Sequence, residues 1–375
     1  MSLPYRRSFV EIDLSAIAHN TRVIAEAMAP ARVLAVVKAD AYGHGAVPVA
    51  RASLAAGAWG LAVATTDEAL ALRSVPEFAH VRILVMAPTL ADEARALQAA
   101  RLDVTIGNLE LLRHHLEVAR DLGPARLHIQ VDTGIGRDGF RFDDTSYLEA
   151  FAPADPSFAG FLCHFSVADG LTPDEEAFTR LQQERFEALR AQVLARGHRP
   201  LFHTGNSGAI LRHRYVKGDL VRPGMMLYGV DPAGTLNPPL DLRPVLTLKS
   251  RLGSVRRIKA GDSVSYGRTW TATSHTTIGV VPLGYGDGFP RLFSNKGMVL
   301  VHGRRVPIRG RVCMDQFMVD LSEVPGARDG DEVVVYGSQG AERLALEEMA
   351  ATAGTIPYEL TCFLTNRVPR VFHGG

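Results

Sequence analysis

The amino-terminal 222 residues repeat one pattern, in which a short apolar run with strand character is followed by a longer stretch with helical periodicity. Amphipathic stretches separate most of the runs, and the clearest extends from Asp174 to Arg196. The strand-like runs cover residues 33–37, 58–63, 81–86, 102–106, 126–131, 158–163, 200–203 and 218–222. Such alternation is typical of a parallel sheet, and eight repeats favour an α/β fold closed into a (β/α)8 barrel of the TIM type. An open, doubly wound sheet is the alternative.

The character of the sequence changes after Tyr228. The segment Asp231–Pro244 is rich in proline and is interpreted as an interdomain linker. Short strand-like runs without long helices follow it, at residues 245–258, 276–283, 297–301, 305–309, 316–320 and 332–336, and one late helix is expected near residues 342–352. We therefore predict two domains, a barrel over residues 1–235 and a smaller, mostly β domain over residues 236–375.

Composition argues against several classes of function. The chain carries 41 basic and 40 acidic residues, which is not the basic footprint of a nucleic-acid binder. No apolar run approaches the ~20 residues that span a bilayer, and no signal peptide is predicted. Three widely separated cysteines predict neither a disulfide framework nor a metal site, so a cytoplasmic location is expected. The histidines lack metal-ligand spacing, and His114–His115 is interpreted as part of a solvated helix face.

The stretch from Val33 to Gly45 combines a buried strand with reactive side chains. It reads VLAVVKADAYGHG, so the apolar run ends at Lys38 and glycines follow. Burial at a strand end disfavours a charged amine, and a neutral amine can form a Schiff base with a carbonyl cofactor. The alternative is a lysine that only ends a strand and extends its amine to water.

Polar side chains also follow several other predicted strands. Catalytic groups of a barrel lie at the carboxyl ends of its strands, where phosphate sites also occur. The residues at these ends are Lys38, Tyr42, Arg137, His164, Asn206, Ser207, Arg222 and Gly224. The hydroxyl of Ser207, a helix start and the Gly224 amide form a plausible phosphate cradle. The GxGxxG pattern of Gly134, Gly136 and Gly139 is not interpreted as a dinucleotide site, because no helix opens directly after it.

Motifs from both halves of the chain together resemble bacterial alanine racemase, a fold-type III pyridoxal-phosphate enzyme. They are VVKADAYGHG, DTGIGRDG, CHF, HTGNSG, VRPGMMLYG, VSYGRTW, VPLGYGDG, RVCMDQ and TIPYEL…RVPR, in this order over nearly the whole chain. The resemblance implies a pyridoxal 5'-phosphate-binding barrel and a carboxyl-terminal β domain that completes the partner subunit's site in a homodimer. It further implies interconversion of L- and D-alanine, which supplies D-alanine for peptidoglycan.

Site residues follow from the resemblance at matching positions. Lys38 would hold pyridoxal phosphate and serve as one catalytic base, and Tyr266 from the other subunit would serve as the second. The remaining cofactor contacts implied are Tyr42, Arg137, His164, Asn206, Ser207, Arg222, Gly224 and Tyr358. Arg137 and Met314 would bind the substrate carboxylate, whereas Tyr285 and Tyr358 would narrow the entrance.

The chemistry of racemisation agrees with these roles, since two bases must flank a planar Cα. A phenol with its ordinary pKa of about 10 is a poor base at neutral pH, so cations such as His164 and Arg222 are needed near Tyr266. An arginine at the pyridine nitrogen gives it no proton readily, which discourages transamination.

One position departs from the family pattern. Many members carry a carbamylated lysine where this chain has Gln130, and a neutral amide cannot supply that negative charge. We expect Gln130 and a bound anion, chloride by preference, to hold Arg137; the alternative is a direct hydrogen bond between the two side chains.

Three other functions remain open at this point. A decarboxylase of the same barrel class would present an acidic partner to the pyridine nitrogen, and Arg222 argues against it. A broader-specificity amino-acid racemase is closer to the pattern. A non-catalytic pyridoxal-phosphate carrier would not need Tyr266 or Met314, which occur in the β domain.

Overall fold

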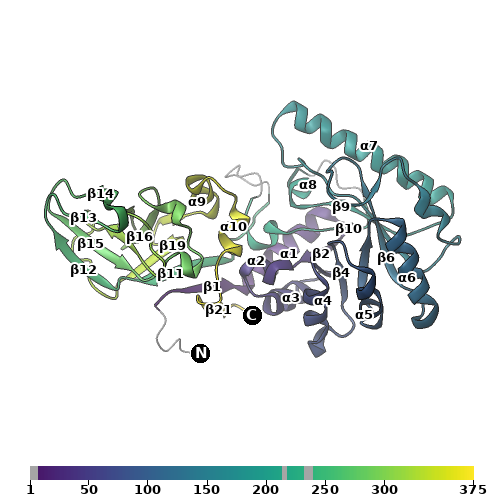
Figure 1. Cartoon of the computed structure of the whole chain (residues 1–375), viewed down its shortest axis with the longest axis horizontal. Coiled ribbons are helices and arrows are strands. Elements are labelled where there is room, and N and C mark those ends of the chain that lie inside the picture. The colour runs from purple at the N-terminus through teal and green to yellow at the C-terminus, as the bar shows by residue number, and fades with distance from the viewer. Residues whose placement is uncertain (1–6, 213–217, 232–239) are drawn as a thin grey trace. The chain divides into compact units, whose positions relative to one another are not determined.

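The computed structural model describes residues 7–212, 218–231 and 240–375, and the chain forms two compact units (Figure 1). The barrel unit contains residues 17–41 and 46–242, and the β unit contains residues 1–16, 42–45 and 243–375. The predicted boundary between residues 235 and 236, with much of the predicted linker, lies outside the described residues.

The barrel unit is a closed ring of parallel strands. Within the described residues these are β2 (Arg32–Val36), β3 (Gly60–Val63), β4 (Arg82–Val85), β5 (Asp103–Ile106), β6 (Arg126–Asp132), β8 (Phe158–Leu162), β9 (Leu201–Gly205) and β10 (Leu220–Val221). They pair in the order β5-β4-β3-β2-β10-β9-β8-β6, and β6 pairs with β5 to close the ring. The short β7 (Phe140–Arg141) pairs with β6 outside the ring. The predicted barrel is confirmed, and the open sheet is wrong.

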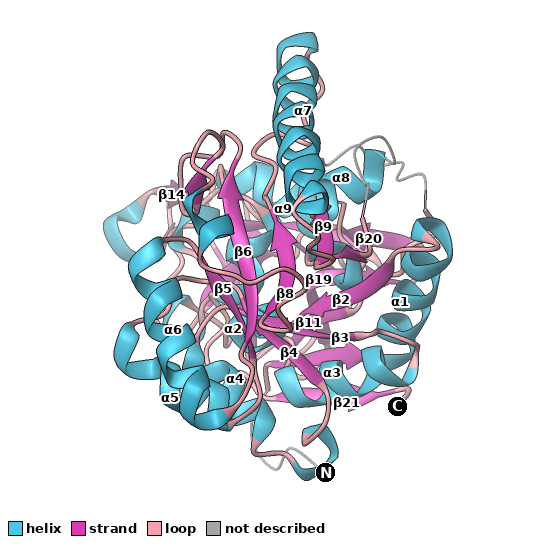
Figure 2. Ribbon diagram, turned by 90° about the vertical axis from the view of Figure 1, so that its right-hand side faces the viewer, coloured by secondary structure: helices cyan, strands magenta, loops and turns pink. Residues whose placement is uncertain are grey.

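Helices follow most of the strands, and α4, α5 and α6 lie on the outside of the strand ring in Figure 2. The helices of this half of the chain are α1 (Leu14–Met28), α2 (Lys38–Gly43), α3 (Ala46–Ala55), α4 (Thr66–Arg73), α5 (Ala94–Ala99), α6 (Leu109–Leu122), α7 (Pro173–Ala195) and α8 (Ser207–Arg212). The helix predicted from Asp174 is α7, which begins at a capping box between Thr172 and Glu175. None of the helices in the described residues is long and apolar enough to cross a membrane.

Helix α6 corrects one expectation. His115 is fully buried, although the pair His114–His115 was expected on a solvated face. The reason is helical register: His115 follows Leu111 by four residues, so it continues the stripe of Leu111 and Leu112 that faces the core.

The β unit is built on one large sheet in the order β12-β15-β18-β17-β16-β19-β11-β1-β21, with β20 paired to β19 and a separate β13–β14 pair. Its strands are β1 (Phe9–Asp13), β11 (Leu246–Arg251), β12 (Ser254–Ile258), β13 (Ser263–Val264), β14 (Trp270–Thr271), β15 (Thr276–Val281), β16 (Met298–Val301), β17 (Arg304–Arg309), β18 (Phe317–Asp320), β19 (Glu332–Gln339), β20 (Glu342–Leu344) and β21 (Arg370–His373). Two helices follow, α9 (Leu346–Ala353), which is the predicted late helix, and α10 (Pro357–Cys362).

The amino-terminal strand differs from the predicted division of the chain. We assigned residues 1–235 to the barrel, but β1 pairs antiparallel with β11 and parallel with β21. These partners lie more than 200 residues away in the sequence, so no local pattern indicates them.

Candidate active site

Lys38 is the first residue of α2 and follows β2, whose last four residues are buried. The side chain of Lys38 is half-buried. This placement confirms the predicted strand end and sets an amine at the carboxyl end of a barrel strand, where barrel enzymes carry their catalytic groups.

The backbone after Lys38 turns in the left-handed sense. Residues 39–42 have φ between +52° and +54°, a conformation that costs roughly 1–2 kcal/mol for each residue other than glycine. Specific hydrogen bonds hold this turn. The Ala39 N–H donates to Glu68 Oε1 at 2.6 Å, and the Ala46 N–H donates to Asp40 Oδ1 at 2.7 Å.

Glu68 therefore has two tasks. Its Oε2 atom accepts the N–H groups of Ala64 at 2.8 Å and Thr65 at 3.1 Å, which completes the capping box of α4. Its Oε1 atom fixes the turn that follows Lys38. We did not predict this role, although Thr65-x-x-Glu68 is a readable capping-box pattern.

Three cations lie around His164. The pKa of His164 is lowered to about 3, mainly by burial and further by the positive charges of Arg222, Arg137 and Lys38. The imidazole is consequently neutral at neutral pH, so the positive charge that we expected from His164 comes from the lysine and the two arginines. Its Nε2 atom lies 3.3 Å from Nδ2 of Asn206, a donor only, and therefore accepts this hydrogen bond.

Arg222 is buried with an extensive set of acceptors. Its Nη1 atom donates to Nδ1 of His203 at 2.9 Å and to the carbonyl of His203 at 2.8 Å, while Nη2 donates to the carbonyls of Cys163 at 2.7 Å and Thr204 at 3.4 Å. Burial lowers the pKa of Arg222 to about 10, so the guanidinium stays charged at neutral pH. These contacts use the N–H groups of Nη1 and Nη2. Within the described residues they leave the Nε–H of Arg222 without an acceptor.

Residues of the predicted phosphate cradle lie close together in the barrel unit. The Gly224 N–H donates to Oγ of Ser207 at 2.9 Å, which joins the loop after β10 to the first residue of α8. Asn206 accepts the Ala209 N–H at 3.0 Å through Oδ1 and donates through Nδ2 to the Phe165 carbonyl at 3.1 Å. The side-chain amide of Asn206 thus connects the loops that follow β8 and β9 by hydrogen bonds.

Gln130 lies inside the same barrel and is buried. Its Nε2 atom donates to the carbonyl of Asp138 at 2.8 Å and lies 3.4 Å from the Asp138 carboxylate. The neighbouring Arg137 is exposed. The side-chain amide of Gln130 therefore holds the loop that carries Arg137 by a hydrogen bond to Asp138.

Tyr42 and Tyr358 meet in the β unit. Their ring centroids are 5.9 Å apart at an interplanar angle of 61°. The next residue, Gly43, has φ of +79°, and a Cβ atom there would lie 2.4 Å from the carbonyl oxygen of Thr361 on α10. Only glycine fits this close approach, so the Tyr42 segment is fixed against α10.

The other predicted residues of the β unit are exposed. The exposed fraction is 72% for Tyr266, 53% for Met314 and 44% for Tyr285. Backbone contacts bring two of them together: the N–H groups of Tyr285 and Gly286 donate to the carbonyls of Cys313 at 3.0 Å and Met314 at 2.8 Å.

The loop before Tyr266 lies against the same segment. The hydroxyl of Ser265 donates to the Arg311 carbonyl at 2.6 Å and lies 3.4 Å from Sγ of Cys313. Tyr266, Tyr285 and Met314 therefore lie on neighbouring loops.

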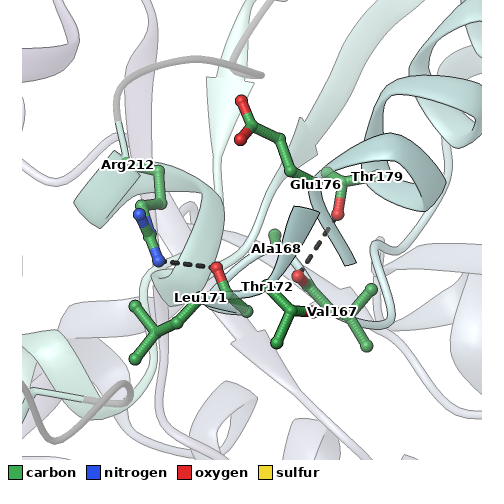
Figure 3. A pocket seen from close by; sticks show the side chains of 8 residues that line it. Val167, Ala168, Leu171, Thr172, Glu176, Thr179 and Arg212 are labelled. Carbon is green, nitrogen blue, oxygen red and sulfur yellow. Dashed lines mark hydrogen bonds between the residues drawn. The ribbon is translucent and has the colours of Figure 1, made fainter. Parts of the chain in front are cut away.

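Two cavities of the barrel unit lie apart from these residues. Figure 3 shows the smaller one, of about 30 Å³, where Thr179 donates to the Val167 carbonyl at 3.2 Å beside Arg212 and Glu176. Its volume is enough for about one water molecule. The larger one, of about 360 Å³, is lined by Arg101 and Arg126. Neither is lined by a predicted site residue.

Two family models match almost the entire chain. Residues 12–232 match the alanine racemase N-terminal domain, and residues 245–372 match the alanine racemase C-terminal domain. The chain belongs to the alanine racemase family. Its activity is that of an alanine racemase, an isomerase that interconverts the two enantiomers of alanine.

Individual relatives agree over the full length. The alanine racemase of Syntrophobacter fumaroxidans is 40% identical, and the match covers 98% of each chain. The solved alanine racemase from Streptomyces lavendulae has a TM-score of 0.92 and 38% identity, with 99% of this chain and 98% of that chain covered. The alanine racemase from Bartonella henselae, solved with covalently bound pyridoxal phosphate, has a TM-score of 0.85 and 29% identity over 98% of this chain and all of that chain.

Proposed function

We propose that this alanine racemase uses pyridoxal 5'-phosphate, with Lys38 and Tyr266 of the partner subunit as bases on opposite faces of the alanine Cα. The observation that carries the proposal is the set of three cations, Lys38, Arg137 and Arg222, around His164 at the carboxyl ends of barrel strands. The covalent pyridoxal phosphate of the Bartonella henselae relative supports the choice of cofactor.

The side chains present fit this cofactor. Lys38 provides an amine for its aldehyde, and the Nε–H of Arg222 is the donor left over among the described residues for its ring nitrogen. Oγ of Ser207 accepts the Gly224 N–H at 2.9 Å, and we propose that the Ser207 O–H donates to the phosphate and that the Gly224 N–H turns to the phosphate when the cofactor binds. Tyr42, Tyr358 and Asn206 complete the proposed contacts.

Bound pyridoxal phosphate withdraws electrons from the Cα of an attached amino acid and so acidifies its proton. Lys38 removes or returns this proton at Nζ on one face, and Tyr266 of the partner subunit does so at Oη on the other. Arg137, with Met314, holds the substrate carboxylate. Because His164 is neutral, the charge that favours anionic groups in the site comes from Arg137 and Arg222.

In this proposal Arg222 limits how strongly the ring of the cofactor withdraws electrons. Arg222 would face the pyridine nitrogen without readily giving it a proton, whereas a carboxylate at this position would favour the protonated ring. A weaker electron sink favours return of the proton to Cα. Tyr285 and Tyr358 are proposed to narrow the entrance for a substrate as small as alanine.

We further propose that the active form is a homodimer. Tyr266, Met314 and Tyr285 are large side chains that remain well exposed within one chain, and exposed apolar side chains on neighbouring loops are typical of an interface. A cytoplasmic location and a role in supplying D-alanine for peptidoglycan complete the proposal. The three widely separated cysteines predict no disulfide framework, which fits a reducing compartment.

Isotope exchange tests the two-base mechanism. The purified protein is incubated with L-alanine in deuterated water, and loss of the Cα proton is followed together with D-alanine formation. We expect exchange with inversion, which Lys38→Ala abolishes. Tyr266→Phe should retain cofactor binding but lose inversion, whereas a carrier protein would be indifferent to the change. Exchange with retention would remove Tyr266 as the second base.

The anion beside Arg137 is a separate proposal. Gln130 donates to Asp138 and carries no charge, so we propose that chloride supplies the negative charge that helps to hold Arg137. Crystals of the holoenzyme soaked in bromide should show an anomalous peak beside Arg137. A map from chloride- or bromide-containing crystals without such a peak would overturn this proposal.

A further inference from the structure

A continuous chain of buried polar side chains crosses the interior of the barrel. Arg222 Nη1 lies 2.9 Å from Nδ1 of His203, whose Nε2 lies 2.9 Å from Nδ1 of His128. Nε2 of His128 lies 3.0 Å from Oδ1 of Asp103. All four side chains are at most 4% exposed. This series of hydrogen bonds connects the loop after β10 to the first residue of β5, by way of β9 and β6.

The donors and acceptors in this chain have one consistent assignment. A guanidinium only donates, so Nδ1 of His203 accepts, and the proton of this ring is on Nε2. That Nε2–H donates to Nδ1 of His128, so the second ring also has its proton on Nε2. This proton is donated to the carboxylate of Asp103. Both imidazoles are thereby neutral and are fixed in the same tautomer.

The electrostatics agree with this assignment. Burial lowers the pKa of His203 well below its ordinary value, and the charge of Arg222 lowers it further, so this ring is neutral. Burial opposes ionisation of Asp103, but hydrogen bonds from His128 and Arg82 outweigh it and lower the pKa of the carboxyl. Arg82 donates through Nε at 2.9 Å and also through Nη2. Asp103 is therefore a fixed negative charge.

The packing around His128 is specific to its ring. Gly160 on β8 faces the imidazole, and a Cβ atom on Gly160 would lie 1.9 Å from Nδ1 of His128. The rings of His128 and His203 meet edge to face, with centroids 5.1 Å apart. Glycine at this position gives the ring the space that the hydrogen-bond chain requires.

We propose that Asp103, His128 and His203 form a positioning relay for Arg222. The carboxylate polarises both imidazoles in the same direction, which makes Nδ1 of His203 a stronger acceptor. This acceptor holds the guanidinium and leaves its Nε–H directed to the ligand site. The relay rests on the proposed function only for the cofactor contact of Arg222; the tautomers stand independently of it.

The tautomers are measured first, on the unaltered chain without cofactor. Histidine labelled with ¹⁵N in the ring is incorporated, and long-range ¹H–¹⁵N spectra are recorded between pH 6 and 9, with His128→Gln and His203→Gln for assignment. We expect both rings to be neutral with the proton on Nε2. A proton on Nδ1 of either ring, or a doubly protonated His203, would overturn the relay.

Asp103→Asn then tests whether the negative charge of Asp103 affects the proposed cofactor site through His128, His203 and Arg222. We expect a movement of the His203 ring resonances, weaker retention of pyridoxal phosphate by the apoprotein, and a fall in kcat of roughly 10- to 100-fold, the scale at which groups that orient catalytic ligands act in metal sites. The matched control is Asp121→Asn, because Asp121 is exposed and pairs only with Arg95 in the described residues, at 2.7 Å.

The outcomes separate the alternatives. If Asp103→Asn lowers the melting temperature but leaves the His203 spectrum and cofactor retention unchanged, Asp103 has only a structural role and the proposal fails. If the unaltered chain binds no pyridoxal phosphate, the proposed function fails, while the spectra of the unaltered chain still decide the tautomers. A spectral change in Asp121→Asn equal to that in Asp103→Asn would also contradict the relay.

Discussion

Nη1 of Arg222 donates to Nδ1 of His203 at 2.9 Å, so a buried guanidinium is anchored by a neutral imidazole and not by a carboxylate. A buried arginine paired directly with a carboxylate would have its charge neutralised within the pair. Here the nearest carboxylate in the relay, Asp103, is two imidazoles away. The positive charge of Arg222 therefore remains available to anionic groups in the site.

Arg222→Lys tests how much the hydrogen bonds of the planar guanidinium stabilise the fold. Lysine keeps the charge but lacks the planar fork, so acceptors on His203 and Cys163 lose their donors. We expect the free energy of unfolding of the apoprotein to fall by about 1–3 kcal/mol, as measured by urea denaturation. Arg95→Lys, at an exposed ion pair, is the control and should change it by less than about 0.5 kcal/mol. Equal losses in both variants would contradict the prediction.

Glu68→Ala should weaken the turn that carries Lys38. The substitution leaves the N–H groups of Ala39, Ala64 and Thr65 without their carboxylate acceptor. We expect a loss of about 1–2 kcal/mol in the free energy of unfolding, as for other helix caps, together with weaker cofactor retention because the left-handed turn relaxes.

Glu93→Ala is the matched control for Glu68→Ala. Glu93 also accepts a backbone N–H in a cap, from Leu90 at 2.6 Å, but within the described residues the turn after Lys38 donates to Glu68 and not to Glu93. The control should lose stability without losing cofactor. Loss of cofactor in both variants would show that retention follows global stability and not the turn.

His115 makes the stability of the fold depend on pH. Burial, with a smaller contribution from the charge of His114, lowers the pKa of His115 from 6.5 to about 4. The unfolded chain therefore binds a proton that the folded chain does not, and the stability is lost as pH falls from about 6.5 to 4. The shift corresponds to at most about 3 kcal/mol.

His115→Leu should remove this dependence. Nε2 of His115 is buried without a hydrogen-bond partner among the described residues, so leucine also removes an unsatisfied polar atom. Urea denaturation between pH 4 and 8 should give a flatter profile and higher stability at pH 5 than the unaltered chain. His114→Gln should keep a sloping profile. An unchanged slope in His115→Leu would assign the pH dependence to other groups.

The sequence predicted the barrel well because each strand is a short apolar run between helical stretches. Short apolar runs are typical of buried parallel strands, and the ends of the predicted strands then locate Lys38, Arg137, His164 and Arg222. The pairing of β1 with β11 and β21 could not be predicted, because it joins residues far apart. Four successive left-handed residues, none of them glycine, also contradict local propensity.

The relay was missed for a different reason. His128 lies in the middle of the predicted strand 126–131, and His203 ends the predicted strand 200–203 but lies inside β9 in the structure; no role was predicted for either. A histidine within an apolar strand is itself a signal, because a buried polar side chain requires a partner. The roles of Tyr266, Met314 and Tyr285 came from family resemblance, since nothing in their local spacing indicates catalysis.

Gly160→Ala should disturb the relay without changing any of its members. A Cβ atom on Gly160 would lie 1.9 Å from Nδ1 of His128, so the ring must move, and overpacking of this kind costs about 1–3 kcal/mol. We expect lower stability in urea and altered ring resonances of His203. Gly253→Ala is the control, since its nearest contact is the flexible end of Arg7 at 3.0 Å. If both variants are equally stable and the histidine spectrum of Gly160→Ala is unchanged, the tight fit around His128 does not hold the relay in place.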